Sequence, residues 1–236
     1  MMIRNLFNGI KRLIPMVLYM TFYLLWFGYL ERTVTTDYHL IHMSLDDYIP
    51  FIEAFIIPYE MWFFYVAATY IFLAFTDSEE YKKTCIFSCL GMTLFLIIST
   101  VYPNGHDLRL SQMPRNNLLT RLVVHLQQTD TPTNLFPSIH VYNAIAMNIG
   151  LHRGKALKDR KWIKTCSSIL CVSIILSTVF IKQHSVFDVI TAFLCVAVFY
   201  HLVYQTRFVD ILANTYHKLF KNNTSNEQNE DEVTAS

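Results

Sequence analysis

Six stretches of the chain are almost continuously apolar, and polar or charged segments separate them. A membrane-spanning helix needs about 20 mostly apolar residues. Five stretches approach this length, whereas the fourth is short and carries Ser, His and Asn residues, so we expect its neighbours to shield it. The pattern predicts an all-α, polytopic membrane protein, a six-transmembrane-helix bundle with spans at about 13–30, 54–75, 84–101, 139–152, 165–182 and 186–204.

The composition agrees with a membrane protein, because 53% of the 236 residues are hydrophobic and only 16% are charged. A formal net charge of +1 gives no electrostatic footprint for a nucleic-acid partner. The five cysteines lie in or beside apolar stretches, without the spacing of a disulfide framework or a zinc site. We therefore expect no nucleic-acid partner, no metal and no cofactor, and protein partners stay unknown.

The placement of Lys and Arg predicts the orientation of the chain. Residues 152–164 carry several basic side chains and the single acidic Asp159, which is typical of a cytoplasmic loop. The charged residues of 31–53 are, in contrast, mainly acidic. Both termini are then predicted to be cytoplasmic. Tyr102, His140 and His184 come from three separate segments and should all emerge on the extracytoplasmic side.

The two ends of the chain have their own patterns. Residues 1–12 can form an interfacial amphipathic helix, with basic side chains on one side and apolar ones on the other. Residues 206–236 are predicted to be a cytoplasmic tail, disordered from about residue 222, where the sequence is polar, acidic and free of aromatic residues.

Two histidines and an aspartate at the mouths of apolar segments are the strongest chemical signal. His184 and Asp188 would lie one turn apart on a helix, where the carboxylate can orient the imidazole and leave its other nitrogen free to react. His140 follows Pro137 and Ser138 at a predicted helix start, where free backbone N–H groups favour a phosphate. His140 could act as a general acid. The other histidines that we considered are expected to be interfacial anchors, namely His39, His42, His106, His125 and His201.

Three short motifs resemble those of the type 2 phosphatidic acid phosphatase superfamily, which are usually Lys-x6-Arg-Pro, Pro-Ser-Gly-His and Ser-Arg-x5-His-x3-Asp. Here they read Tyr102-x6-Arg109-Leu110, Pro137-Ser138-Ile139-His140 and Ser177-Thr178-x5-His184-x3-Asp188. The flanks of the first two are also similar to a subgroup near inositol phosphorylceramide synthases. Tyr102 replaces the lysine of the family, and Thr178 replaces an arginine.

The resemblance implies a metal-independent, membrane-bound phosphoric-ester hydrolase at residues 13–205, a six-helix membrane phosphatase-like domain. His184 would form a phosphohistidine, Asp188 would orient it, and His140 would protonate the departing lipid alcohol. The phosphate of a membrane lipid would be held by Arg109, Ser138, Tyr102 and Lys182.

Three functions are left open by these residues. The first is hydrolysis of a lipid phosphate monoester or pyrophosphate at the outside face of a membrane, expected to be a bacterial plasma membrane. The second is transfer of a lipid headgroup, as in inositol phosphorylceramide and sphingomyelin synthases. The third is a non-catalytic scaffold or transporter, which the loss of two cationic groups at Tyr102 and Thr178 would fit.

Overall fold

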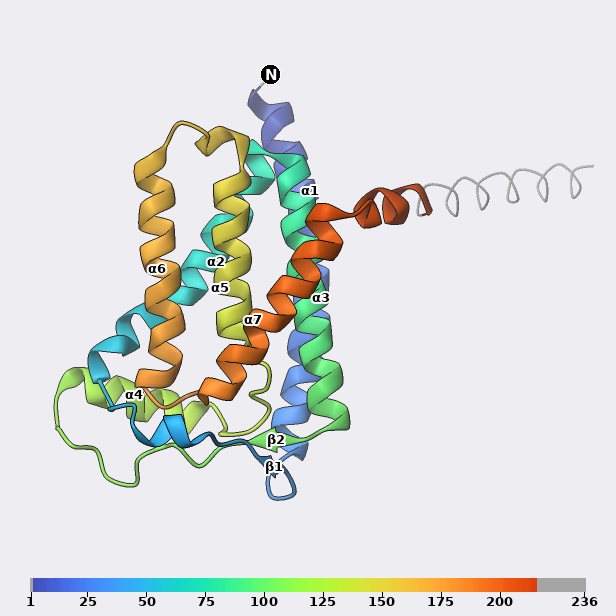
Figure 1. Ribbon diagram of the computed structural model, residues 1–236. Helices are drawn as coiled ribbons and strands as arrows, with labels where there is room; N and C mark the ends of the chain where they lie inside the picture. The colour runs from blue at the N-terminus through green and yellow to red at the C-terminus, as the bar shows by residue number, and fades with distance from the viewer. Residues whose placement is uncertain (1, 216–236) are drawn as a thin grey trace, which may run out of the picture.

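Seven α-helices dominate the computed structural model, which describes residues 2–215, with side chains from residue 7 onward (Figure 1). Residues 208–215 are helical as well, and the predicted disorder from residue 222 lies outside the described part of the chain. The seven helices are α1 (Met2–Thr33), α2 (Ile56–Thr76), α3 (Ser78–Val101), α4 (Leu118–Thr129), α5 (Ile139–Arg153), α6 (Lys161–Phe180) and α7 (Val186–Tyr200).

Shorter elements connect these helices. The strands β1 (His39–Leu40) and β2 (Asn104–Gly105) pair in parallel, with His39 opposite Asn104. A π-helix, η4 (His201–Gln205), continues α7. The 3-10 turns are η1 (Ser44–Asp47), η2 (Glu53–Phe55) and η3 (Lys155–Leu157).

Five helical segments are long and apolar enough to cross a membrane, so the prediction of a helical membrane protein is confirmed at that level. They are Phe7–Thr33, Glu53–Thr76, Ser78–Val101, Lys161–Phe180 and Val186–Gln205. The remaining predicted span, the fourth at about 139–152, corresponds to α5, which has only 15 residues, about 22 Å at 1.5 Å per residue. A sixth crossing and the cytoplasmic position of both termini stay predictions.

The short α5 packs against α2, α3, α6 and α7, and its Val141, Ala144 and Met147 are fully buried. Gly91 of α3 permits this packing, because a Cβ there would overlap the ring of Tyr142. Tyr142 donates a hydrogen bond from its hydroxyl to the Phe87 carbonyl at 2.8 Å. The polar residues of this segment are therefore carried on a helix that other helices cover, as expected for the weakest of the apolar stretches.

Capping residues, and not apolarity alone, set the helix ends. The helix α3 begins at Ser78, six positions before the predicted span, because Asp77 accepts a hydrogen bond from the Glu80 N–H at 3.2 Å. The helix α1 runs without a break from Met2 to Thr33. The first twelve residues are thus continuous with the first long helix and are not a separate element, and their position at a membrane interface stays a prediction.

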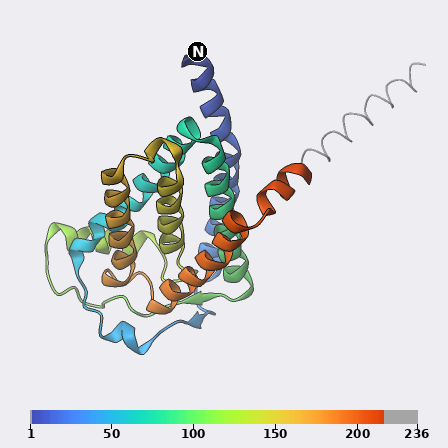
Figure 2. The same ribbon diagram turned by 45° about the horizontal axis from the view of Figure 1, so that its top comes forward.

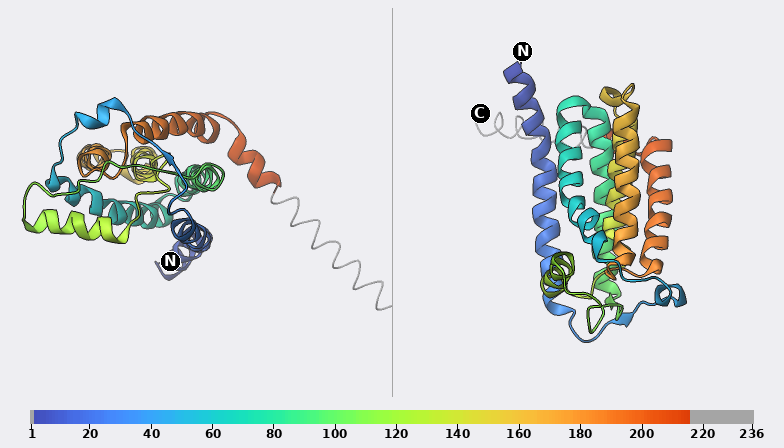
Figure 3. Two further views of the ribbon diagram at one scale, coloured as in Figure 1. Left: turned by 90° about the horizontal axis from the view of Figure 1, so that it is seen from below. Right: turned by 90° about the vertical axis from the view of Figure 1, so that its left-hand side faces the viewer.

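The segments that connect α1 to α2, α3 to α5 and α6 to α7 gather at one end of the bundle, opposite the N-terminus (Figures 1 and 2). Seen from below, α4 lies across this end and does not run along the bundle helices (Figure 3). The end of α6, the start of α7, the start of α5 and both short strands meet in the same region (Figure 1). All of the predicted site residues belong to segments that converge here.

Candidate functional site

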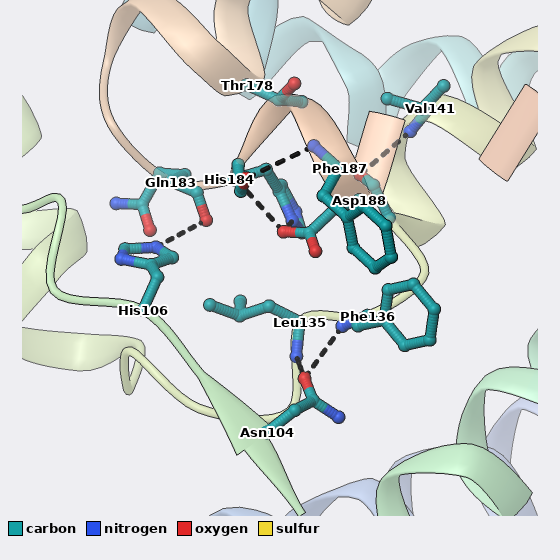
Figure 4. Close-up of polar contacts among 12 residues, drawn as sticks. Asn104, His106, Leu135, Phe136, Val141, Thr178, Gln183, His184, Phe187 and Asp188 are labelled. Atoms are coloured by element: carbon teal, nitrogen blue, oxygen red, sulfur yellow. Dashed lines mark hydrogen bonds and ion pairs between the residues drawn. The ribbon is translucent and has the colours of Figure 1, made fainter. Parts of the chain in front are cut away.

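The start of α7 places His184 and Asp188 together. Ser185 is the N-cap, and Asp188, at the third helical position, accepts a hydrogen bond from the Ser185 N–H at 3.0 Å, which completes a capping box. The same carboxylate oxygen lies 3.2 Å from Nδ1 of His184 (Figure 4). One carboxylate therefore caps the helix and orients the imidazole, as the i, i+4 spacing predicts.

The end of α6 holds the backbone of His184. The carbonyl of Thr178 accepts hydrogen bonds from the N–H groups of Gln183 and His184, at 2.9 and 3.0 Å. Lys182 adopts the left-handed region at φ 58°, which reverses the chain between the two helices. The contribution of Thr178, which stands where the family has an arginine, is thus made through its backbone.

His184 is nearly buried, with 4% of its surface exposed. Burial and the positive charge of Arg109 lower the pKa of His184 to about 3, so the imidazole is neutral near pH 7. With Nδ1–H donated to Asp188, the lone pair is on Nε2. A neutral imidazole with this tautomer is the form that can attack an electrophile.

His140 lies at the start of α5 and faces His184. The ring centroids are 5.7 Å apart, and Nε2 of His140 is buried without a hydrogen-bond partner among the described residues. Tyr59 and Trp62 of α2 pack on the imidazole, each with its ring centroid at 4.5 Å. These contacts hold the His140 ring beside His184.

Ser138 connects the start of α5, which carries His140, to α7, which follows His184. Its hydroxyl accepts a hydrogen bond from the Val141 N–H at 3.4 Å and so caps α5, and its own N–H donates to the Asp188 carbonyl at 3.2 Å. The preceding segment is held by Asn104, whose side-chain oxygen accepts from the N–H groups of Leu135 and Phe136, at 2.9 and 3.0 Å (Figure 4). Ser138 therefore lies beside the catalytic candidates, with its hydroxyl used as a cap.

His106 is not an interfacial anchor, because only 2% of its surface is exposed. Its Nδ1 accepts a hydrogen bond from the Leu108 N–H at 3.2 Å, so Nε2 carries the proton and donates to the Gln183 carbonyl at 2.8 Å (Figure 4). Burial lowers the pKa of His106 to about 4 and keeps it neutral. No motif singles out this residue, and only its position between Tyr102 and Arg109 could have suggested a role.

Arg109 joins the loop after α4 to the segment that carries His184. One terminal nitrogen donates to the carbonyls of Gln127 and Asp130, at 2.9 and 2.8 Å, and the other donates to the Thr131 carbonyl and to Oε1 of Gln183, both at 3.0 Å. Its Nε is buried without a partner among the described residues. Arg109 is therefore ordered beside His184 and keeps one free donor.

The other two residues predicted to hold phosphate are directed elsewhere in this structure. The ring of Tyr102 stacks on His39, with centroids 4.1 Å apart, and 44% of Tyr102 is exposed. The ammonium group of Lys182 donates to the Asp46 carbonyl at 2.7 Å. The structure brings His140, Ser138, Arg109 and Asp188 close to His184, but it does not bring the functional groups of Tyr102 and Lys182 there.

Several buried hydrogen-bond donors near the histidines lack an acceptor within the described part of the chain. They belong to Trp62, which packs on His140, to Arg109 and Gln183, which contact each other, and to Gln127, whose carbonyl Arg109 binds. Buried donors in proteins are nearly always paired. A set of unpaired donors beside a cation fits a ligand that brings acceptor oxygens, as a phosphate does.

Asp130, in the loop behind Arg109, gives this region a pH-dependent stability. Burial and then the charge of Glu31 raise the pKa of its carboxyl from 3.8 to about 6. Because the folded protein favours the protonated form, the stability that this group contributes is largest below about pH 4 and is lost as the pH rises to about 6.

We expect Asp130→Asn to raise the thermal unfolding midpoint of the purified protein at pH 8 and to leave it nearly unchanged at pH 4. The gain at pH 8 is on the order of 1–3 kcal/mol, at 1.36 kcal/mol for each unit of pKa. Asp107 is an exposed aspartate, and Asp107→Asn is the control. It should change the midpoint neither at pH 4 nor at pH 8. If Asp130→Asn changed the unfolding midpoint equally at pH 4 and pH 8, the raised pKa of the Asp130 carboxyl would be contradicted.

Comparison with known proteins adds one finding. Residues 115–211 match the family model described as the PAP2 superfamily. The matched range contains Ser138, His140, His184 and Asp188, whereas Tyr102 and Arg109 precede it. No curated protein and no solved structure matches the chain significantly.

Proposed function

Because this chain belongs to the PAP2 superfamily through residues 115–211, we propose that it is an integral-membrane lipid phosphatase. It would hydrolyse a lipid phosphate monoester or pyrophosphate, similar to phosphatidate, through a phosphohistidine on His184. The observation that carries the proposal is the buried His184–Asp188 pair, whose imidazole faces His140 at a centroid separation of 5.7 Å.

In the first step, Nε2 of His184 attacks the phosphorus atom, the N–P bond forms, and the bond from phosphorus to the lipid oxygen breaks. His140 gives a proton to the departing alcohol. In the second step, water attacks the phosphorus, the N–P bond breaks, and His140 takes the proton of the water. Asp188 stabilises the positive charge that develops on the His184 ring in both steps.

Charge on the phosphoryl oxygens would be balanced by groups that the structure keeps close to His184. Arg109 has a free Nε, and Gln183 has a free side-chain N–H group next to it. The first N–H groups of α5, at Ile139 and His140, precede the first helical hydrogen bond, from the Tyr142 N–H to the Ser138 carbonyl. This set supports phosphate binding without Tyr102 or Lys182.

Replacing Arg109 by lysine tests this binding role. Lysine keeps the charge but has no planar fork and no Nε–H, so we expect kcat/KM to fall about 100-fold. Arg115→Lys is the matched control, because Arg115 pairs with Glu53 at 2.7 Å and is largely exposed. Equal kcat/KM values for the two variants would remove Arg109 from the phosphate site.

Headgroup transfer is the second candidate. It is supported by Tyr102 and Thr178, which replace two cationic residues of phosphatidate phosphatases, and by the flanks that are similar to inositol phosphorylceramide synthases. In this reaction the hydroxyl of an acceptor alcohol would replace water in the second step. A non-catalytic scaffold is the third candidate, and the ordered His184–Asp188 pair argues against it.

Turnover in lipid nanodiscs distinguishes the three functions. The purified protein would be given phosphatidate, an isoprenoid pyrophosphate and a headgroup phospholipid, each with and without an acceptor alcohol. Release of inorganic phosphate without acceptor supports the phosphatase, and a new headgroup lipid that forms only with acceptor supports the transferase. Absence of any product would favour the scaffold. Labelling in intact cells would test the proposed position of the site at the outside face of a bacterial plasma membrane.

A further inference from the structure

Asp46 is a buried carboxylate in the loop between α1 and α2, far in sequence from the motifs. Only 2% of its surface is exposed, although it lies in the short turn η1 at the end of the bundle. Burying a carboxylate is costly unless hydrogen bonds compensate for the lost water. The contacts of Asp46 show what its charge stabilises.

Three of its five hydrogen bonds reach the connection between α6 and α7 or the first residue of α7. Oδ2 of Asp46 accepts from the Ser185 hydroxyl at 2.6 Å, and Oδ1 accepts from the Val186 N–H at 2.7 Å. Its backbone carbonyl accepts from Nζ of Lys182 at 2.7 Å. The remaining two fix the turn itself: the Met43 N–H donates to Oδ2 at 2.8 Å, and the Asp46 N–H donates to the Met43 carbonyl at 2.8 Å.

These partners lie on both sides of His184 in the sequence. Ser185 is the N-cap of α7, and its N–H is held by Asp188, the residue that orients the imidazole. Asp46 therefore fixes the capping residue from one side while Asp188 fixes it from the other. A negative charge at the first turn of α7 is also favoured by the helix dipole.

We propose that Asp46 is a positioning residue for the reaction at this site. It acts through Lys182, Ser185 and Val186 to hold the His184–Asp188 pair in the orientation from which Nε2 attacks phosphorus. The inference rests on the proposed phosphohistidine chemistry, because it assigns Asp46 a role in that same site. Asp46 itself contacts neither histidine.

Asparagine has nearly the same shape but cannot replace this carboxylate. If its oxygen accepts from Val186, its amide nitrogen faces the N–H of Met43, and if the amide is reversed, the nitrogen faces the N–H of Val186. In either orientation, the amide N–H group lies against a backbone N–H group, so two donors face each other without an acceptor. The loop should therefore shift, and a displacement of about 1 Å at a reacting group can cost on the order of 100-fold in rate.

The test compares Asp46→Asn with Asp47→Asn in nanodiscs. Asp47 is the adjacent carboxylate, 64% of its side chain is exposed, and it contacts His42. We expect Asp46→Asn to lower kcat and the rate of phosphohistidine formation about 10- to 100-fold, with KM within about threefold of the wild-type value. Asp47→Asn should match the wild type in all three.

Ser185→Ala keeps the test decisive if Asp46→Asn does not fold. It removes the hydroxyl that Asp46 binds, so it should lower kcat in the same direction. In the double variant, the two effects should not be additive, because they act through one contact. Wild-type kcat in Asp46→Asn would overturn the positioning role. Additive effects in the double variant would overturn it as well. A wild-type protein without turnover would instead reject the proposed function.

Discussion

Replacing His184 by alanine is expected to abolish turnover of the lipid phosphate, with a fall in kcat of at least about 10,000-fold. The variant loses the nitrogen that is proposed to attack phosphorus, and no other described side chain is paired with the Asp188 carboxylate. The rate of product release should be measured in nanodiscs at saturating substrate. KM should change much less than kcat, because the phosphate is held by other groups.

His201→Ala is the matched control for this variant. His201 begins the π-helix after α7, its ring forms a hydrogen bond with the side chain of Gln205, and it is exposed. We expect the His201 variant to retain wild-type kcat. A His184 variant that keeps more than about a tenth of the wild-type rate would mean that another residue is the nucleophile.

Asp188→Asn should lower kcat about 100- to 10,000-fold. Asparagine has no negative charge to balance the positive ring of phosphorylated His184. Single-turnover measurements should show slower formation of the phosphoenzyme and slower decay.

A capping carboxylate at the far end of the bundle provides the control for Asp188. Asp77 accepts hydrogen bonds from the N–H groups of Glu80 and Lys155, at 3.2 and 3.0 Å, and is the N-cap of α3, whereas Asp188 completes the capping box of α7. Asp77→Asn should lower the thermal unfolding midpoint and leave kcat unchanged. If both variants lose activity in proportion to their stability, the role of Asp188 is structural and not catalytic.

The helical fold follows from the sequence because apolar runs of about 20 residues have few alternatives in a bilayer. Five of the predicted spans coincide with helices of suitable length and hydropathy. The ends were less accurate, because caps such as Asp77 extend a helix into polar sequence where the apolar pattern has already stopped. The first twelve residues are continuous with α1 for another reason, since a helix does not end where its face changes from amphipathic to apolar.

The local part of the site was also predictable. The pairing of His184 with Asp188 needs only one turn of helix, and Ser185 marks the start of that helix. The approach of His140 requires the three motifs to meet at one end of the bundle, and the predicted alternation of six spans places them there.

The supporting contacts could not be predicted, because they join segments that are distant in sequence. Asp46 reaches Ser185 across 139 positions, and His106 reaches Gln183 across 77. Neither residue has a partner at a regular spacing. Lys182 is close to His184 in the sequence, but its positive φ and the Asp46 carbonyl direct its ammonium group elsewhere.

Identification of the phosphorylated residue tests the central claim most directly. The purified protein would be mixed with a lipid carrying a labelled phosphate, quenched within milliseconds at alkaline pH, where phosphohistidine is stable, and digested for mass spectrometry. We predict label on His184 that forms and decays at rates compatible with turnover and is absent from His184→Ala. Turnover without label on His184, or label on another residue that persists in His184→Ala, would contradict the mechanism.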